Sequence, residues 1–280
     1  MSAIDRLIEG SIDIHVHFGP DARVERRADA LQVARAAHAM GMRGIVLKAH
    51  EYTTAPLAYL VGQQVSGLAV MGGLCLDVEV GGLNPMALEA TANLGGKVIW
   101  MPTFSAQSDR KRQGLEGGIV ILDDKGRLVP ELYTILDAIK RHDLVLATGH
   151  LSPKESLALV QEARHLGLNR IVVTHASHIH HWMGMTVEDM VALARMGALI
   201  EHCVGVMMPL NQRMTPQALA EMIRAVGAEN CVLSTDFGQA HHPIAPEGFR
   251  MGIATLLRAG MDEVDLGLMV KDNPARLLGL

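Results

Sequence analysis

The sequence predicts an α/β protein built as one (β/α)₈ TIM barrel over residues 1–280, with a β-hairpin inserted after the fourth strand. Two observations predict this fold. Eight short apolar runs alternate with eight longer segments of helical period, which is typical of parallel strands joined by right-handed crossovers. The chain length also fits the roughly 250 residues that such a barrel usually needs.

The apolar runs are predicted as strands because each is short and bounded by polar or turn-forming residues. They cover residues 12–17, 43–48, 68–76, 98–101, 144–148, 170–174, 198–202 and 231–235. The carboxyl ends of parallel barrel strands meet at one mouth, where barrel enzymes place their catalytic groups. The residues that end these runs are therefore the first place to look for a functional site.

Helices are predicted between the strands from the spacing of their apolar positions. They cover residues 29–40, 54–65, 85–94, 131–141, 153–166, 187–196, 216–226 and 248–259. Ser152, Pro153 and Glu155 supply an N-cap, a proline at the first helical position and a capping-box acid. Glycines that follow helical segments, such as Gly167 and Gly197, are typical of helix ends.

The fourth strand–helix unit is longer than the others. Residues 105–112 are predicted as a polar loop, and residues 118–129 as a β-hairpin that turns at Asp123-Asp124-Lys125-Gly126. Because the insertion follows a strand, we expect it over the mouth of the barrel, where insertions of this kind form lids. A hairpin at an oligomer interface is the alternative interpretation.

Composition and charge favour a small-molecule partner. The chain is 49% hydrophobic and 20% charged, and its net charge of −5 leaves no broad basic surface for nucleic acid or an anionic membrane. The first residues lack a signal peptide and no apolar run is long enough to span a bilayer, so we expect a cytoplasmic protein. Cys75, Cys203 and Cys231 are interpreted as reduced core residues. A homo-oligomer is compatible with the sequence.

The first predicted strand carries a candidate metal-binding pair. In its alternating pattern, Asp13, His15 and His17 lie on the face opposite the apolar residues 12, 14 and 16. Two imidazoles on the same face of a rigid strand are the geometry that a divalent metal needs from neutral nitrogen ligands. An isolated pair of this kind is more often just a polar strand face.

Other strand ends strengthen the metal interpretation. His150 follows the fifth predicted strand, His175 ends the sixth, and Asp236 ends the eighth. A single His or Asp at a strand end is usually a satisfied polar residue. Because all these strand ends converge on one mouth, the residues are expected to lie together.

In this order the residues resemble the metal-ligand pattern of the amidohydrolase superfamily, which is H-x-H on the first strand, His on the fifth and sixth, and Asp on the eighth. The residues that match it position by position are His15, His17, His150, His175 and Asp236. The closing residues 273–280 are also similar to the family's C-terminal helix, so the resemblance spans the chain.

The resemblance implies a metal-dependent hydrolase that contains Zn²⁺, as one or two ions, or else Mn²⁺ or another divalent ion. Metal-activated water would attack a C–N or C–O bond in a small polar amide, cyclic amide, lactone or amidine. Asp236 is expected to act as the general base. His175 is expected to bind a second metal or to stabilise the developing oxyanion. Asp13 is expected to accept a hydrogen bond from a ligand imidazole or to form a structural ion pair.

The chain departs from the family pattern at the fourth strand. Binuclear members carry a carboxylated Lys or a Glu there, but this strand ends in Trp100-Met101-Pro102-Thr103. Lys48 instead ends the second strand, and a second-strand Cys has a similar bridging role in the D-aminoacylase branch. Lys48 is expected either as a metal-bridging carbamate or as an ammonium that binds a substrate carboxylate or phosphate, and the empty fourth-strand position favours the ammonium.

Several further polar residues near predicted strand ends are candidates for contact with substrate, namely His50, His178, Glu201, His202 and His241. The loop that contains His178, His180 and His181 could instead be solvent-exposed surface. The charge cluster at residues 110–112 has the same alternative interpretation. Aromatic residues make up only 3% of the chain, which argues against a stacking pocket for a nucleobase.

Three other functions remain open from the sequence. Barrels that resemble aminocarboxymuconate semialdehyde decarboxylase remove CO₂ from carboxylates with a single metal, and a phosphoesterase is a second possibility. The third is a metal-binding relative that has lost its activity. Retention of all five predicted ligands argues against that last case.

Overall fold

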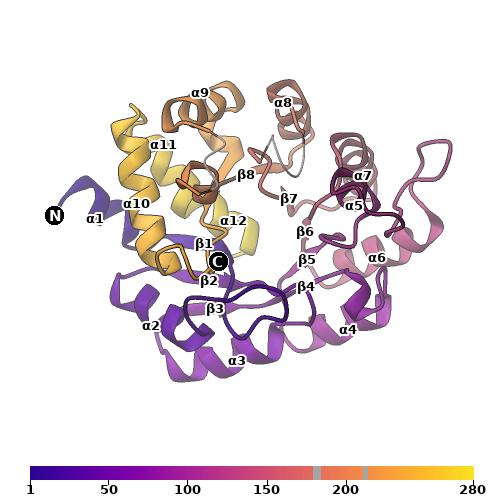
Figure 1. The fold of residues 1–280 in the computed structure, drawn as a ribbon, viewed down its shortest axis with the longest axis horizontal. Helices are drawn as coiled ribbons and strands as arrows, with labels where there is room; N and C mark the ends of the chain where they lie inside the picture. Colours follow the sequence, from indigo (N-terminus) through magenta and orange to yellow (C-terminus); the bar gives the residue numbers. More distant parts are fainter. Residues whose placement is uncertain (179–183, 211–213) are drawn as a thin grey trace.

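A computed structural model of the protein describes residues 1–178, 184–210 and 214–280, and all eight predicted strands are present in those ranges. One of them is divided in two, so the strands are numbered β1 to β9 (Figure 1). Their bounds are β1 Ile12–Val16, β2 Gly44–Leu47, β3 Ala69–Met71, β4 Gly73–Cys75, β5 Val98–Trp100, β6 Val145–Ala147, β7 Ile171–Val173, β8 Leu199–Cys203 and β9 Cys231–Ser234.

All neighbouring strands pair in parallel, in the orders β1-β2-β3 and β4-β5-β6-β7-β8-β9. Two backbone hydrogen bonds join the first strand to the last. The His17 amide donates to the Phe237 carbonyl at 2.8 Å, and the Asp236 amide donates to the His15 carbonyl at 3.0 Å. These bonds close the barrel at its carboxyl end, so residues at the strand ends share one mouth.

The third predicted strand is divided at Gly72, where the start of the preceding helix, at Thr54 and Ala55, lies against the strand. The Thr54 hydroxyl donates to the Leu47 carbonyl at 2.7 Å and accepts from the Gly73 amide at 2.8 Å. The Thr54 amide also donates to the Gly73 carbonyl at 3.0 Å. A single threonine therefore links β2 to β4 where strand pairing is interrupted.

The eight predicted helices are present around the outside of the strands (Figure 1). They are α2 Ala30–Ala39, α3 Ala55–Gln64, α4 Pro85–Asn93, α6 Pro130–Arg141, α7 Pro153–His165, α8 Val187–Arg195, α9 Pro216–Val226 and α10 Ala245–Arg258. The capping box at Ser152 and Glu155 is formed as predicted. Additional α-helices are α1 Ala3–Ile8, α5 Gln107–Arg112, α11 Glu263–Gly267 and α12 Asn273–Leu278. Among the helices described, none has the length and apolar character needed to cross a membrane.

The core consists of two layers. Side chains such as Ile12, Ile14 and Trp100 fill the barrel interior, and Leu277 and Leu278 of α12 pack into the same cluster. A larger cluster lies between the strands and the surrounding helices. The C-terminal helix therefore covers the end of the barrel opposite the mouth.

The insertion after β5 differs in part from its prediction. Part of the predicted polar loop is the helix α5. Residues 118–129 turn at the predicted position and contain one antiparallel bridge between Leu122 and Leu128. No strand is assigned to this described segment, so a two-stranded hairpin is not confirmed.

We predict that Gly72→Ala destabilises the fold by about 1–3 kcal/mol, because its new Cβ must push against backbone. That Cβ would lie 2.6 Å from the Thr54 carbonyl carbon and 2.7 Å from the Ala55 amide nitrogen. Urea unfolding measures the change. The matched control is Gly62→Ala within α3, whose Cβ would meet nothing closer than Val70 at 4.0 Å. Equal stabilities for the two variants would contradict the proposed role of the Thr54 junction.

Candidate metal centre

A β-bulge in β1 aims His15, within the strand, and His17, directly after it, into the barrel. Between Asp13 and Val16, β1 advances one residue more than its neighbour β2. Ile14 therefore packs in the barrel interior while His15 also points inward, toward Trp100, with ring centroids 6.2 Å apart. Our prediction that His15 lies on the face opposite Ile14 is wrong for this reason, although the pairing of His15 with His17 holds. Bulges often redirect side chains beside active sites.

His15, His17 and Asp236 converge at the mouth. Asp236 Oδ1 lies 3.2 Å from the Nε2 atom of each histidine, and the three ligand atoms lie within 4.8 Å of one another. Two imidazoles and a carboxylate form a donor set that suits Zn²⁺ or a related divalent ion. The other ring nitrogen of His17, Nδ1, is buried and has no hydrogen-bond partner among the described residues. These residues fit a metal.

The backbone at two of the strand ends adopts a conformation that is rare for residues with side chains. His175 has φ of 32° and Asp236 has φ of 57°, in or near the left-handed region. Such conformations persist only where the surrounding structure holds them, and they concentrate at functional sites. Each residue lies two positions after the last residue of a strand, so this backbone turns their side chains over the mouth.

More histidines surround this group. Ring centroids lie 5.9 Å apart for His15 and His175, 4.9 Å for His150 and His175, and 5.1 Å for His17 and His50. His178 stacks on His175 at 5.0 Å. The mouth is therefore lined with imidazoles, as the strand-end pattern predicts. His150 and His175 lie beside the group of His15, His17 and Asp236, outside the ligand sets within 4.8 Å among the described residues.

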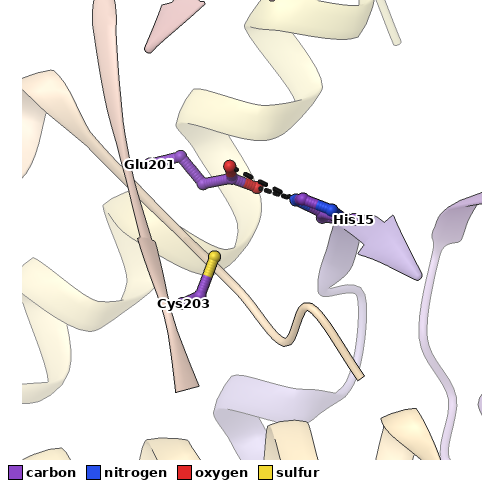
Figure 2. A group of neighbouring side chains, drawn as sticks. All are labelled: His15, Glu201 and Cys203. Carbon is purple, nitrogen blue, oxygen red and sulfur yellow. Dashed lines mark hydrogen bonds and ion pairs between the residues drawn. The ribbon is translucent and has the colours of Figure 1, made fainter. Parts of the chain in front are cut away.

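Glu201 on β8 holds the imidazole of His15 (Figure 2). Its carboxylate oxygens lie 3.1 and 3.4 Å from His15 Nδ1, and both side chains are buried. Glu201 also accepts hydrogen bonds from the His175 amide at 2.7 Å and the Ser234 hydroxyl at 2.7 Å. Because Nδ1–H donates to Glu201, the Nε2 lone pair is left for a cation. These contacts favour a role in orienting His15 over the predicted contact with substrate.

Within residues 1–178, 184–210 and 214–280, no imidazole forms a hydrogen bond with Asp13, which corrects one of our predictions. The bulge places it on the outer side of β1, where it accepts from the Thr235 amide at 3.1 Å and the Thr235 hydroxyl at 2.6 Å. Burial raises the pKa of Asp13 to about 7, although the Thr235 hydrogen bonds oppose that shift. Asp13 thus links β1 to the end of β9.

Lys48 is buried at the end of β2 and points into the mouth, as expected. Its Nζ lies 3.0 Å from His15 Nε2 and 5.4 Å from the centroid of the Trp100 ring. Among the ion pairs of the described residues, none includes Lys48. Buried lysines usually pair with a carboxylate, so Lys48 has the position expected of a functional group.

Two aspartates that the sequence analysis missed hold the neighbouring histidines. Asp109 on α5 lies 3.3 Å from His150 Nδ1. Asp77, after β4, lies 3.7 Å from His50 Nδ1 and accepts from the Thr103 amide at 2.8 Å. Asp77 directly follows the predicted strand at residues 68–76, so the strand-end rule could have found it. Asp109 lies in the insertion, away from any predicted strand end, so that rule does not reach it. The inserted segment therefore contributes directly to the mouth through α5.

The remaining candidates lie further from the centre. His202 follows Glu201 on β8 and so points to the opposite side, where its Nδ1 lies 3.2 Å from the Ser177 hydroxyl. This contact favours a structural role for His202. His241 is exposed and lies against His242, with ring centroids 4.3 Å apart. His180 and His181 lie outside the described residues.

Burial favours the neutral form of four imidazoles at the mouth by lowering their pKa values. It lowers the pKa of His17 to about 3 and that of His178 to about 4, and it also lowers the pKa values of His150 and His175. Burial alone would raise the pKa of Asp236, but its contacts with His15 and His17 outweigh burial and lower it. Neutral imidazoles next to an ionised carboxylate are the protonation states that metal binding requires.

Solved structures share this fold over nearly the whole chain. An amidohydrolase from Pseudomonas aeruginosa is 14% identical, with a TM-score of 0.65 and 98% of each chain covered. A dihydroorotase from Campylobacter jejuni is 14% identical at a TM-score of 0.59, over 97% of this chain and 84% of that one. A 2,6-dihydroxybenzoate decarboxylase from Rhizobium is 12% identical at a TM-score of 0.59, over 97% of this chain and 99% of that one. At these identities the similarity establishes a shared barrel fold and leaves the activity open.

The sequence itself matches a family of unknown function, DUF6282, over residues 10–201, and the protein belongs to that family. The matched segment contains β1 through most of β8, including His15, His17, His150 and His175. Asp236 lies beyond it. No curated protein matches the chain.

We predict that the metal-free protein loses stability as the pH falls from 6.5 toward 4. Imidazoles of the unfolded chain bind protons near pH 6.5, whereas burial lowers the pKa of His17 to about 3 and the pKa values of His178 and His202 to about 4. The unfolded state then binds more protons, so the free energy of unfolding falls by roughly 1.4 kcal/mol per pH unit for each such group. Urea unfolding across this range measures the slope, and His202→Gln should reduce it. A free energy of unfolding that is constant over this range would disprove the assignment of buried neutral imidazoles.

We also predict that Glu201→Gln lowers metal affinity about 10–100-fold, the usual effect of removing a carboxylate that supports a ligand histidine. Glutamine keeps the size of the side chain but removes the charge that makes His15 a stronger ligand. Competition with a chromophoric chelator measures the affinity. Glu221→Gln on the exposed side of α9 is the control and should bind metal as the wild type does. Equal metal affinities in Glu201→Gln and Glu221→Gln would show that Glu201 does not support His15 as a ligand.

Proposed function

We propose that this protein is a metal-dependent hydrolase that acts on a C–N or C–O bond of a small polar substrate, such as an amide, cyclic amide, lactone or amidine. The observation that carries the proposal is the convergence of His15 Nε2, His17 Nε2 and Asp236 Oδ1 at the mouth of the barrel. Zn²⁺, or Mn²⁺ or another divalent ion, is the cofactor that this donor set fits. A bound ion of this kind supplies hydroxide at neutral pH and polarises a substrate carbonyl.

The chain's own residues divide the remaining work. Asp236 is ionised, because the neighbouring imidazoles outweigh the effect of burial on its pKa, so it is able to accept a proton and return it to the leaving group. His175 lies beside His15 and His150 and carries a buried Nδ1 that has no hydrogen-bond partner among the described residues. That position suits a ligand of a second metal ion or a group that contacts the developing oxyanion.

Lys48 supports a substrate with a carboxylate or a similar anionic group. As an ammonium, its buried Nζ would pair with such a group beside the reacting centre. As a carbamate it would instead be an anion that bridges two ions, and an experimental structure with density beyond Nζ would assign this second role. We favour the ammonium because β5 ends in residues without a bridging group.

A decarboxylase is the second candidate function. The fold is shared with the Rhizobium 2,6-dihydroxybenzoate decarboxylase, and Lys48 would bind a carboxylate in either reaction. Product analysis distinguishes the two reactions. A decarboxylase releases CO₂ and consumes no water, whereas a hydrolase adds water to its substrate. His50, His178 and His241 remain candidates for contact with the substrate in both cases, since they lie at or beside the same mouth.

We predict that Asp236→Asn lowers kcat about 10²–10⁴-fold when measured in saturating metal, because the variant lacks the proton acceptor. A screen of small lactones, cyclic amides and carboxylated amides provides the substrate for the wild type. Asp124→Asn, on the exposed turn of the insertion, is the control and should keep full activity. Near-normal kcat in Asp236→Asn with metal bound would mean that another residue is the base and would overturn the proposed mechanism.

A further inference from the structure

Cys203 ends β8 in the same mouth as the candidate metal centre. It lies two residues after Glu201, so both side chains leave the strand on its inner face (Figure 2). The side chain is buried, and its thiol contacts the Ser234 hydroxyl at 3.3 Å. The strand-end position distinguishes it from an ordinary core cysteine.

We propose that His178, Cys203 and Asp236 form a second metal site, with a thiolate as one of its ligands. The ring nitrogen, the sulfur and a carboxylate oxygen of these residues lie within 4.8 Å of one another. Asp236 also belongs to the group with His15 and His17, so its carboxylate is shared by the two sites. The inference rests on the proposed metal centre through this shared carboxylate, and it requires no particular substrate.

The contacts around Cys203 favour this group over another one nearby. His15 and Glu201 also lie within 4.8 Å of the thiol, but those two side chains are already joined to each other by a hydrogen bond (Figure 2). His178 Nε2, by contrast, is buried and has no hydrogen-bond partner among the described residues. A buried ring nitrogen that lacks a partner costs free energy unless a ligand satisfies it. A metal ion at this position would remove that cost.

The position of His178 is fixed by the structure around it. Its backbone amide donates to the His175 carbonyl at 3.0 Å, and its ring stacks on that of His175. The ring is therefore held beside Cys203 and Asp236, where it is able to ligate a metal.

A third group of candidate ligands is less suitable. His50, Cys75 and Asp77 also lie within 4.8 Å of one another and are buried. The Asp77 carboxylate, however, already accepts from the Thr103 amide at 2.8 Å and the Ser105 amide at 3.0 Å. These bonds hold the loop after β5, and a metal would have to displace them.

The donor set defines the kind of ion. Thiolate, imidazole and carboxylate together suit Zn²⁺ or Co²⁺ and discriminate against Mg²⁺ and Ca²⁺, which prefer oxygen ligands. When the ion binds, the Cys203 S–H bond breaks, the sulfur keeps the electron pair and donates it to the metal, and the proton passes to the buffer. Binding at the second site therefore releases one proton and strengthens as the pH rises.

Titration of the metal-free protein with Co²⁺ tests the proposal, because thiolate ligation produces a charge-transfer absorption band that imidazole and carboxylate ligands do not. We expect two equivalents to bind, with the band appearing together with one of them. Cys203→Ser and Cys203→Ala should bind one equivalent and show no band. Cys231→Ser is the matched control, since Cys231 is equally buried and belongs to none of the ligand groups among the described residues. It should behave as the wild type does.

The contrary outcomes are distinct. Binding of one equivalent without a band in the wild type would overturn the second site and leave the centre at His15 and His17 intact. A band that survives Cys203→Ser but disappears in Cys75→Ser would place the thiolate in the third group and likewise overturn the proposal. Absence of any bound Co²⁺ would defeat both the second site and the proposed function. Circular dichroism of each variant verifies that it is folded.

Discussion

One of the two backbone hydrogen bonds that close the barrel also assembles the candidate site. The amide of Asp236 donates to the carbonyl of His15, so the last strand is held against the first at the residues that would bind the metal. The same contact brings Asp236 Oδ1 to 3.2 Å from the ring nitrogens of His15 and His17. Fold and function therefore depend on the same closure, and a chain that fails to close has no site.

The closure of the barrel is maintained although it requires backbone strain and the burial of polar atoms at the mouth. Asp236 and His175 hold a backbone conformation that costs of order 1–3 kcal/mol for residues with side chains. Several imidazoles are buried, and His17 Nδ1 and His175 Nδ1 have no hydrogen-bond partner among the described residues. The Asp13–Thr235 hydrogen bonds on the outer side of β1 oppose these costs by fixing the joint between the first and last strands. A bound cation would compensate for them further.

Much of the fold is readable from sequence because it depends on local pattern. Parallel barrel strands are buried on both faces and helices on one, so the apolar period identifies each element, and Ser152 and Glu155 mark a helix start that the structure contains. The convergence of His15, His17 and Asp236 follows from the strand-end rule and barrel topology. The division of the third strand was not predictable in this way, because it depends on Thr54, which comes from another part of the chain.

The parts of the site that escaped prediction are those that depend on three-dimensional contacts. The bulge in β1 reverses the side on which Asp13 lies, and no alternating pattern reveals a single extra residue. Asp109 reaches His150 from the insertion, and Glu201 turns out to hold His15. Cys203 lies in an apolar sequence context like that of a core residue, and its proximity to His178 and Asp236 is visible only in the structure.

The central claim is that His15 and His17 hold a metal ion, and metal content tests it most directly. Protein prepared without a histidine tag and passed through a metal-buffered column can be analysed by mass spectrometry of the bound elements. The account predicts stoichiometric Zn²⁺ or a related ion in the wild type and in His165→Ala, an exposed histidine on α7, and a strong loss in the double variant His15→Ala, His17→Ala. Full metal content in the double variant, or none in the wild type under metal-replete conditions, would contradict it.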